Sequence, residues 1–205
     1  MPHLYYVHDP MCSWCWAFRP VLAELLSRLP AGMGHSRLLG GLAPDSDQPM
    51  SSAMREQLQA TWRRIQAKLP ATDFNFDFWT CNTPRRSTYP ACRAVIAARS
   101  LDESMDEAMT LAIQQAYYLQ ARNPSDDITL IELAGELGLD RRLFGERLNS
   151  PQTQQQLAAE IDQTARMGAR SFPSLVLQDG QTFWPLAVDY QSADVILDSL
   201  DMILD

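Results

Sequence analysis

The sequence predicts an α/β fold in which a mixed sheet is interrupted by a long helical insertion. Two strand-like runs, at residues 4–8 and 36–42, flank a helical pattern at residues 13–29. Helical patterns then dominate as far as residue 167. The chain closes with two strands joined by the turn signal Asp179-Gly180 and a final helix. The predicted order is therefore β-α-β, a helical insertion, then β-β-α.

The first unit follows from local residue preferences. Residues 4–8 are aromatic or branched for the most part, which favours a strand. Apolar side chains recur at helical spacing over residues 13–29, although Pro20 lies inside this stretch and should kink the helix. Because a helix joins the two strands, they should run parallel with a right-handed crossover.

The insertion begins after a linker at residues 44–49, which is rich in Asp, Ser and Pro. The aromatic residues at 74–79 lie in a segment expected to be irregular and to pack between the insertion and the main domain. We expect residues 1–43 and 168–205 to form one domain and residues 44–167 to form the insertion. Helices are predicted over 51–69, 90–99, 106–121, 127–137, 141–148, 153–167 and 192–204, and the last strands over 174–178 and 181–184.

The composition of the chain excludes some classes of binding partner. The chain has 205 residues, 46% of them hydrophobic, which is enough to bury a core without disulfide staples. Its 17 basic and 25 acidic residues leave a net charge of -8, so neither nucleic acid nor an anionic membrane is an expected partner. No long apolar segment and no leader-like N-terminus is visible, and we therefore expect a cytoplasmic location.

The motif Cys12-Ser13-Trp14-Cys15 lies where the first predicted strand leads into the first helix. A helix N-terminus stabilises a thiolate, so the Cys12 pKa should fall below that of a free thiol. Cys15 lies nearly one turn further on and can resolve a mixed disulfide formed at Cys12. An inert pair and half of a zinc site are the alternatives. A second close cysteine pair is missing, so no metal is predicted.

Residues 9–16 (Asp-Pro-Met-Cys-Ser-Trp-Cys-Trp) and 168–174 (Gly-Ala-Arg-Ser-Phe-Pro-Ser) carry a family resemblance. The chain resembles the DsbA-like branch of the thioredoxin superfamily, and within it the FrnE-like subgroup of protein-disulfide isomerases. The resemblance implies a thioredoxin fold with a large helical insertion. It also implies that Pro173 is cis, lies beside the CxxC motif and, with Phe172, shapes a substrate groove.

The motif departs from that of the strongly oxidising DsbA proteins, which carry Pro-His where this chain has Ser13-Trp14. Losing the histidine removes a stabiliser of the thiolate, so a weaker oxidant with a reducing or isomerase-like potential is expected. Trp14 would either contact substrate or cover the sulfur. His8 and Asp9 could tune the cysteine pKa, or be a strand-end histidine and a turn aspartate.

The other two cysteines, Cys81 and Cys92, are eleven positions apart. We expect two free thiols there rather than an accessory redox pair. Arg85 and Arg86 could bind an anionic substrate, but a solvated pair is the expected arrangement.

The predicted function is that of a thiol–disulfide oxidoreductase or isomerase acting on protein or low-molecular-weight disulfides. It needs no metal or organic cofactor, and glutathione could serve as an exchange partner. The alternative is a glutathione-dependent transferase or isomerase of the kappa-class or chromene-carboxylate isomerase type. Those families share the split architecture but use a serine near the position of Cys12. A third possibility is a client-binding module indifferent to both cysteines.

Overall fold

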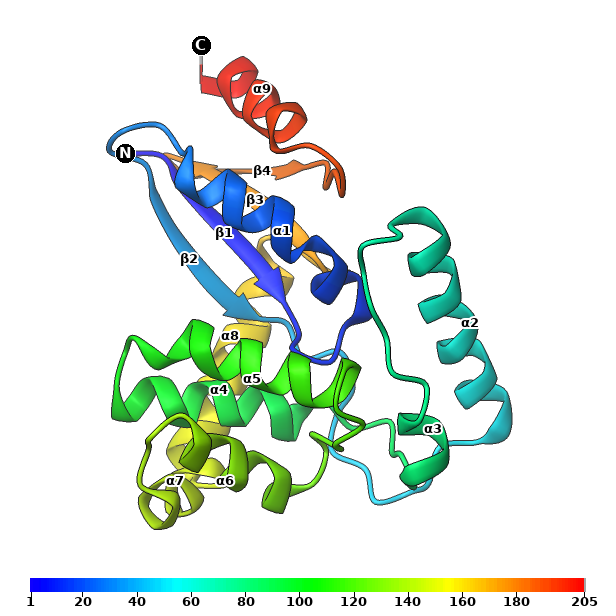
Figure 1. Cartoon of the computed structure of the whole chain (residues 1–205). Coiled ribbons are helices and arrows are strands. Elements are labelled where there is room, and N and C mark those ends of the chain that lie inside the picture. The colour runs from blue at the N-terminus through cyan, green and yellow to red at the C-terminus, as the bar shows by residue number, and fades with distance from the viewer. Residues whose placement is uncertain (205) are drawn as a thin grey trace. The chain divides into compact units, whose positions relative to one another are not determined.

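A computed structural model describes residues 1–204 of the chain. Its sheet contains β1 (His3–His8), β2 (Gly34–Leu39), β3 (Ser174–Asp179) and β4 (Thr182–Leu186) in the order β2-β1-β3-β4 (Figure 1). Strand β1 runs parallel to β2 and antiparallel to β3, and β4 returns antiparallel to β3. The predicted α/β class and mixed sheet are confirmed.

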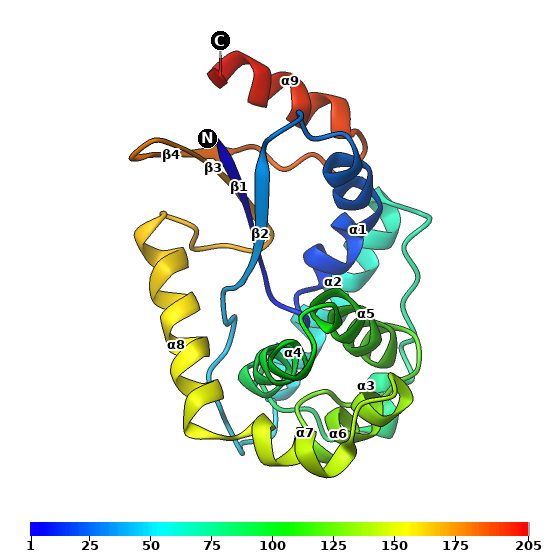
Figure 2. The same cartoon turned by 90° about the vertical axis from the view of Figure 1, so that its left-hand side faces the viewer.

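Helices cover both faces of this sheet. On one face, β1 contributes Leu4 and Tyr6 to a core shared with α1 (Ser13–Ser27) and α9 (Ala193–Leu204). On the other face, Val7 packs in a smaller core with residues that follow α8 (Pro151–Arg166). Figure 2 shows α1 and α9 on one side of the strands and the C-terminal end of α8 on the other. The alternation of side chains along β1 therefore decides which residues face α1.

Helix α1 continues through Pro20 and ends at Ser27, two residues earlier than the apolar pattern predicts. The proline ring is exposed, while the apolar positions Phe18, Leu22 and Leu25 are buried. The missing N–H of Pro20 thus falls on the exposed side of the helix, where it leaves the core packing of α1 intact.

Residues 41–159 contain α2 (Ser52–Lys68), α3 (Phe78–Cys81), α4 (Tyr89–Leu101), α5 (Met105–Tyr118), α6 (Asp127–Glu136), α7 (Arg141–Leu148) and the start of α8. Helix α3 falls in the segment expected to be irregular. Its buried rings Phe78 and Trp79 both pack on Trp62 of α2. Tertiary packing of the aromatic side chains accounts for this extra turn.

The expected solvated arginine pair is wrong for Arg85. This side chain is 27% exposed and forms an ion pair of 2.8 Å with Asp126 at the start of α6. It also donates a hydrogen bond to the backbone carbonyl of Ser125. Arg85 therefore links two segments of the insertion.

The chain forms two compact units. One comprises Met1–Gly40 together with the part from Glu160 onward, and the other comprises Gly41–Ala159. The second passage between the units falls inside α8. The domain boundaries expected at 43/44 and 167/168 remain a prediction. Across residues 1–204, no helix combines the length and apolar character that crossing a membrane would require.

Candidate active site

A tight turn at the end of β1 places Cys12 at the start of α1. The Asp9 carboxylate accepts a hydrogen bond from the Met11 backbone N–H at 2.8 Å, and the Asp9 carbonyl accepts one from the Cys12 N–H at 3.0 Å. Cys12 has extended backbone angles (φ -84, ψ 115) and is the N-cap residue, and α1 begins at Ser13. Its thiol therefore lies among the unpaired N–H groups of the first turn.

The Cys12 pKa is lowered by this position. The main cause is a hydrogen bond with the Cys15 thiol, and burial opposes it. The backbone N–H groups of Cys15 and Trp14 lower the pKa further, as expected at the N-terminus of a helix. Cys12 is thus the sulfur that ionises first.

The Cys15 pKa moves the other way. Burial raises it well above the usual value for a thiol, and the hydrogen bond with Cys12 adds to the shift. Cys12 is 7% exposed and Cys15 is 0% exposed, so a reagent reaches Cys12 first. Both are free thiols in the structure. The two sulfurs are chemically distinct before any substrate binds.

The segment before β3 completes the surroundings of Cys12. The Cys12 thiol donates a hydrogen bond to the Phe172 carbonyl at 3.3 Å. The Phe172–Pro173 peptide bond is cis, as the resemblance implied. A cavity of about 370 Å³ lies along Pro173 and is lined by residues of 168–176 and 185–188. The cavity thus reaches Pro173, the residue after Phe172, while Cys12 itself is not part of its lining.

Aromatic side chains flank the motif on another side. Trp14 is half-buried and packs against Tyr190, with ring centroids 5.0 Å apart at 58°. Tyr190 also meets the buried Phe18 edge-on at 5.7 Å. Its pKa is raised, first by burial and then by the sulfurs of Cys15 and Cys12. Tyr190 was not predicted from the sequence, because no local pattern links the turn before α9 to the motif.

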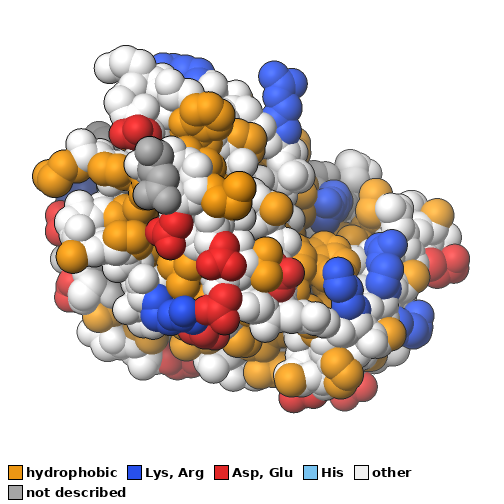
Figure 3. Space-filling view, turned by 90° about the horizontal axis from the view of Figure 1, so that it is seen from above, with side chains coloured by type: hydrophobic (Ala, Val, Ile, Leu, Met, Phe, Trp, Pro, Cys, Tyr) orange, Lys and Arg blue, Asp and Glu red, His pale blue; other side chains and the backbone are white. Residues whose placement is uncertain are grey.

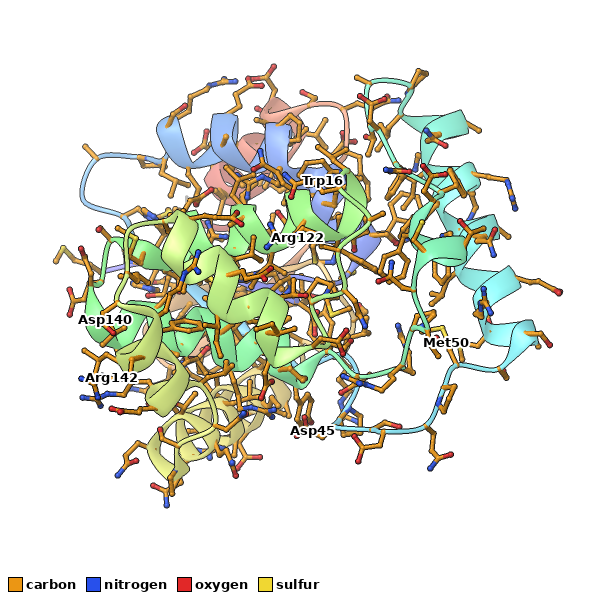
Figure 4. The ribbon with its side chains drawn as sticks, turned by 60° about the horizontal axis from the view of Figure 1, so that its bottom comes forward. Trp16, Asp45, Met50, Arg122, Asp140 and Arg142 are labelled. Atoms are coloured by element: carbon orange, nitrogen blue, oxygen red, sulfur yellow. The ribbon has the colours of Figure 1, made fainter. Side chains whose placement is uncertain are left out.

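Two buried side chains of β1, Tyr6 and His8, stack on one another. His8, expected near the motif, is 1% exposed and stacks on Tyr6, with ring centroids 4.9 Å apart at 4°. Burial raises the pKa of the Tyr6 hydroxyl well above its usual value, and the nearby Cys15 adds to the shift. Sequence analysis missed Tyr6, although strand alternation already places it on the same face as His8. Ser13 and Trp16 are half-buried on the first turn of α1, where Figure 4 labels Trp16.

The remaining cysteines belong to the helical unit. Cys81 ends α3 and is exposed, and Cys92 is buried in α4. Both are free thiols, as expected. Within residues 1–204, no cluster of three or more His, Cys, Asp or Glu side chains is arranged to hold a metal ion.

Known proteins of similar structure share this architecture over their whole length. A candidate protein disulfide isomerase from Nitrosomonas europaea superposes with a TM-score of 0.85 at 27% identity, over 99% of this chain and 97% of that one. The cytosolic disulfide reductase DsbM from Pseudomonas aeruginosa superposes with a TM-score of 0.77 at 25% identity, over 98% of both chains. A second structure of DsbM, solved with GSH, gives a TM-score of 0.76 at 25% identity, over 99% of this chain and 100% of that one.

Sequence comparison finds more distant relatives. The ClpXP adapter protein SpxH of Bacillus subtilis (strain 168) is 24% identical over 179 residues. The match covers 87% of this chain but only 58% of the adapter. The model of the DSBA-like thioredoxin domain matches residues 4–200, which is nearly the whole chain. On this match, together with the mixed sheet and its helical insertion, the chain belongs to the DSBA-like thioredoxin domain family.

Proposed function

We propose that this protein is a thiol–disulfide oxidoreductase in which Cys12 attacks and Cys15 resolves. One observation carries the proposal: Cys12 and Cys15 lie at the N-terminus of α1, where their pKa values shift in opposite directions, lowered for Cys12 and raised for Cys15. Cys12, which has the lower pKa, is also the less deeply buried residue of the two, 7% exposed against 0% for Cys15. A nucleophile needs both properties, and a resolving thiol needs to stay protonated until it acts.

The reaction transfers two electrons in two exchange steps. The Cys12 thiolate attacks one sulfur of a substrate disulfide, which forms a mixed disulfide and releases the other sulfur as a thiolate. Cys15 then gives up its proton, and its sulfur attacks the Cys12 sulfur. The second substrate thiol leaves with that proton, and a Cys12–Cys15 disulfide remains. The substrate disulfide is reduced to two thiols while the protein is oxidised, and the reverse sequence forms disulfides.

The substrate would lie in the hollow beside Pro173. The Phe172 carbonyl, which accepts the Cys12 thiol hydrogen bond, marks the point where a substrate sulfur would approach. Trp14 and Tyr190 form an aromatic surface beside the motif, suited to the apolar part of a substrate. We assign Ser13, Phe172 and His8 supporting roles, because they surround the sulfurs without being the reacting groups.

Reduction with glutathione as the electron donor is the proposed direction in the cell. The similarity to DsbM, a cytosolic disulfide reductase also solved with GSH, supports this direction and a cytoplasmic location. Ser13-Trp14 between the cysteines places no histidine beside the thiolate, which favours a reducing potential. Isomerisation of protein disulfides would use the same first step. A thiolate of the substrate, and not Cys15, would then attack the mixed disulfide and release Cys12.

The proposal is tested by equilibrating the protein in graded glutathione redox buffers, trapping thiols by alkylation, and reading each cysteine by mass spectrometry. We expect a reversible two-electron transition confined to Cys12 and Cys15. Cys12→Ser should abolish exchange, and Cys15→Ser should accumulate the mixed disulfide with glutathione. Cys81→Ser is the matched control, since it removes an exposed thiol and should leave the transition unchanged.

Brief alkylation of the reduced protein tests independently which cysteine is the nucleophile. At pH 7, iodoacetamide should modify Cys12 well before Cys15, because Cys12 has the lower pKa and is the less deeply buried of the two. If Cys12 and Cys15 form no disulfide with each other in any buffer, the proposal is wrong. Glutathione-transferase activity that survives Cys15→Ala would point to the alternative predicted from the sequence.

A further inference from the structure

Tyr190 lies in the short connection between β4 and α9, far from the CxxC motif in the sequence. The Asp189 carboxylate accepts hydrogen bonds from the backbone N–H groups of Gln191 at 2.7 Å and Ser192 at 2.8 Å. These two bonds close the turn directly before α9, which begins at the buried Ala193. The backbone on both sides of Tyr190 is therefore held in place.

The ring of Tyr190 reaches back to the first turns of α1. It meets the fully buried Phe18 edge-on, with ring centroids 5.7 Å apart at 74°. It also packs against Trp14, with ring centroids 5.0 Å apart at 58°. Separations of about 4.5–7 Å are favourable for tilted and edge-on rings. Phe18 thus anchors Tyr190 to the core, and Tyr190 in turn holds the Trp14 indole.

The contact between these two rings lies at the redox motif itself. Trp14 is the second residue of α1 and stands between Cys12 and Cys15. Trp14 and Tyr190 both keep part of their surface exposed, whereas Phe18 has none. Burial raises the pKa of Tyr190, and the Cys15 and Cys12 sulfurs add to the shift, in agreement with a neutral ring close to both. The pair therefore offers a substrate an aromatic surface next to the attacking cysteine.

The segment that carries Tyr190 also borders the cavity along the cis proline. Val188, two residues before Tyr190, lines this cavity of about 370 Å³ together with Pro173. The residue before Pro173 is Phe172, whose carbonyl accepts the Cys12 thiol hydrogen bond at 3.3 Å. A peptide chain that enters the cavity while its sulfur meets Cys12 is therefore bordered by the segment that carries the aromatic ring.

We infer that Tyr190 is a specificity-determining residue: with Trp14 it forms an aromatic surface that selects disulfides in peptides with aromatic side chains next to the cysteine. The inference rests on the function proposed above and names a substrate class for the same site. The exchange chemistry is unchanged, and only the rate of attack by Cys12 depends on the rings. Because an aromatic pair contributes modestly beyond the area it buries, the expected preference over a polar neighbour is about twofold to tenfold.

The test compares the symmetrical disulfides of two blocked, uncharged tripeptides, Phe-Cys-Phe and Ser-Cys-Ser. Each disulfide is mixed with the reduced protein, thiols are trapped by alkylation at intervals, and the loss of reduced protein is followed by mass spectrometry. Each rate is divided by the rate of the same disulfide with dithiothreitol, which removes differences in intrinsic reactivity. We expect the unchanged protein to react faster with the Phe-containing disulfide by the factor above.

Three variants make the test specific for this ring. Tyr190→Leu keeps an apolar side chain but removes the ring, so the ratio of the two rates should fall toward one. Tyr190→Phe removes only the hydroxyl and should keep the ratio. Phe183→Ala is the matched control, because it removes a ring that is 39% exposed and lies opposite Gln178, at the far end of β3 from Ser174. Since the ratio compares two substrates of one variant, a general loss of stability or a changed Cys12 pKa cancels.

Substitution of the second ring tests whether the pair acts as one surface. Trp14→Ala should also remove the preference, and combining it with Tyr190→Leu should lower the ratio no further. A ratio near one in the unchanged protein, which needs no variant to fold, would overturn the inference, and so would a ratio that survives Tyr190→Leu. If Cys12 attacks neither disulfide, the proposed function fails; if it attacks both at equal rates, only this inference fails.

Discussion

At the scale of single residues, the space around Cys12 depends on a glycine that forms no polar contact with it. A Cβ atom built at Gly40 would lie 1.9 Å from Cε1 of Phe172, far closer than any real contact. The backbone N–H of Gly40 donates to the His8 carbonyl at 2.8 Å, which holds Gly40 in place. The absence of a side chain at Gly40 therefore leaves room for Phe172, whose carbonyl accepts the Cys12 hydrogen bond.

Gly40→Ala should consequently disturb both stability and the redox site. Pushing the Phe172 ring aside resembles overpacking of a core, which costs about 1–3 kcal/mol. The carbonyl of Phe172 should move with the ring and change the alkylation rate of Cys12. Urea denaturation and timed alkylation measure the two effects.

Gly145→Ala is the matched control. Gly145 lies inside α7, and an added Cβ would meet the nearest atom, Cδ1 of Ile131, at an ordinary 3.4 Å. Alanine should therefore stabilise the helix by about 0.5–1 kcal/mol and leave Cys12 reactivity unchanged. If both substitutions shift the free energy of unfolding in the same direction, crowding against Phe172 does not explain the effect of Gly40→Ala.

At the scale of elements, α4 is the most buried helix of the insertion and carries a charge within it. Residues 90–98 of α4 are all buried, and among them the Arg93 side chain is 9% exposed. Its guanidinium donates two hydrogen bonds to the Asp45 carboxylate, at 2.8 and 3.0 Å, and one to Asn149 after α7. Asp45 lies in the connection that precedes α2, where Figure 4 labels it. One arginine thus joins three segments of the helical unit.

Substitution of Asp45 should lower the free energy of unfolding more than substitution of Arg93. Asp45→Ala leaves the buried guanidinium of Arg93 without its carboxylate, which should cost about 1–3 kcal/mol. Arg93→Met fills the same space with an apolar side chain and leaves behind an Asp45 that is 60% exposed and can be hydrated, so its cost should be about 1 kcal/mol or less. Urea denaturation of the two variants shows which substitution lowers the free energy of unfolding more. A larger loss for Arg93→Met would contradict the explanation.

At the scale of the whole molecule, the net charge of -8 should steer the choice of substrate. Acidic and basic side chains are interspersed with apolar ones on the face shown in Figure 3. A net charge of this size produces a long-range negative field. Such a field repels anionic disulfides and attracts cationic ones over roughly a Debye length, about 10 Å at 0.1 M salt.

Salt should therefore change the first exchange step in opposite directions for two small disulfides. Raising the ionic strength should speed attack on glutathione disulfide, which is anionic, and slow attack on cystamine, which is cationic. Stopped-flow kinetics of the reduced protein at low and physiological salt measures both rates. The same direction of change for both reagents would show that the long-range field does not reach Cys12.

The sequence by itself determined the order of the elements and the redox motif. Both depend on local information: apolar spacing for helices, strand preferences and turn residues at the ends. The direction of the Cys12 pKa shift was also predictable, because its main cause, the Cys15 thiol, and the backbone N–H groups of the first turn all lie within three residues. The family resemblance also anticipated the cis peptide bond at Pro173.

Only the tertiary structure decided what surrounds the sulfurs. Phe172 reaches Cys12 because β1 and β3 pair antiparallel with Val7 opposite Ser174. Tyr190 approaches Trp14 because the chain leaving β4 returns to the α1 face. These contacts cannot be predicted from the spacing of residues along the sequence, because they depend on strand register and on packing between distant segments. The same reason explains why α3 and the ion pair of Arg85 were missed.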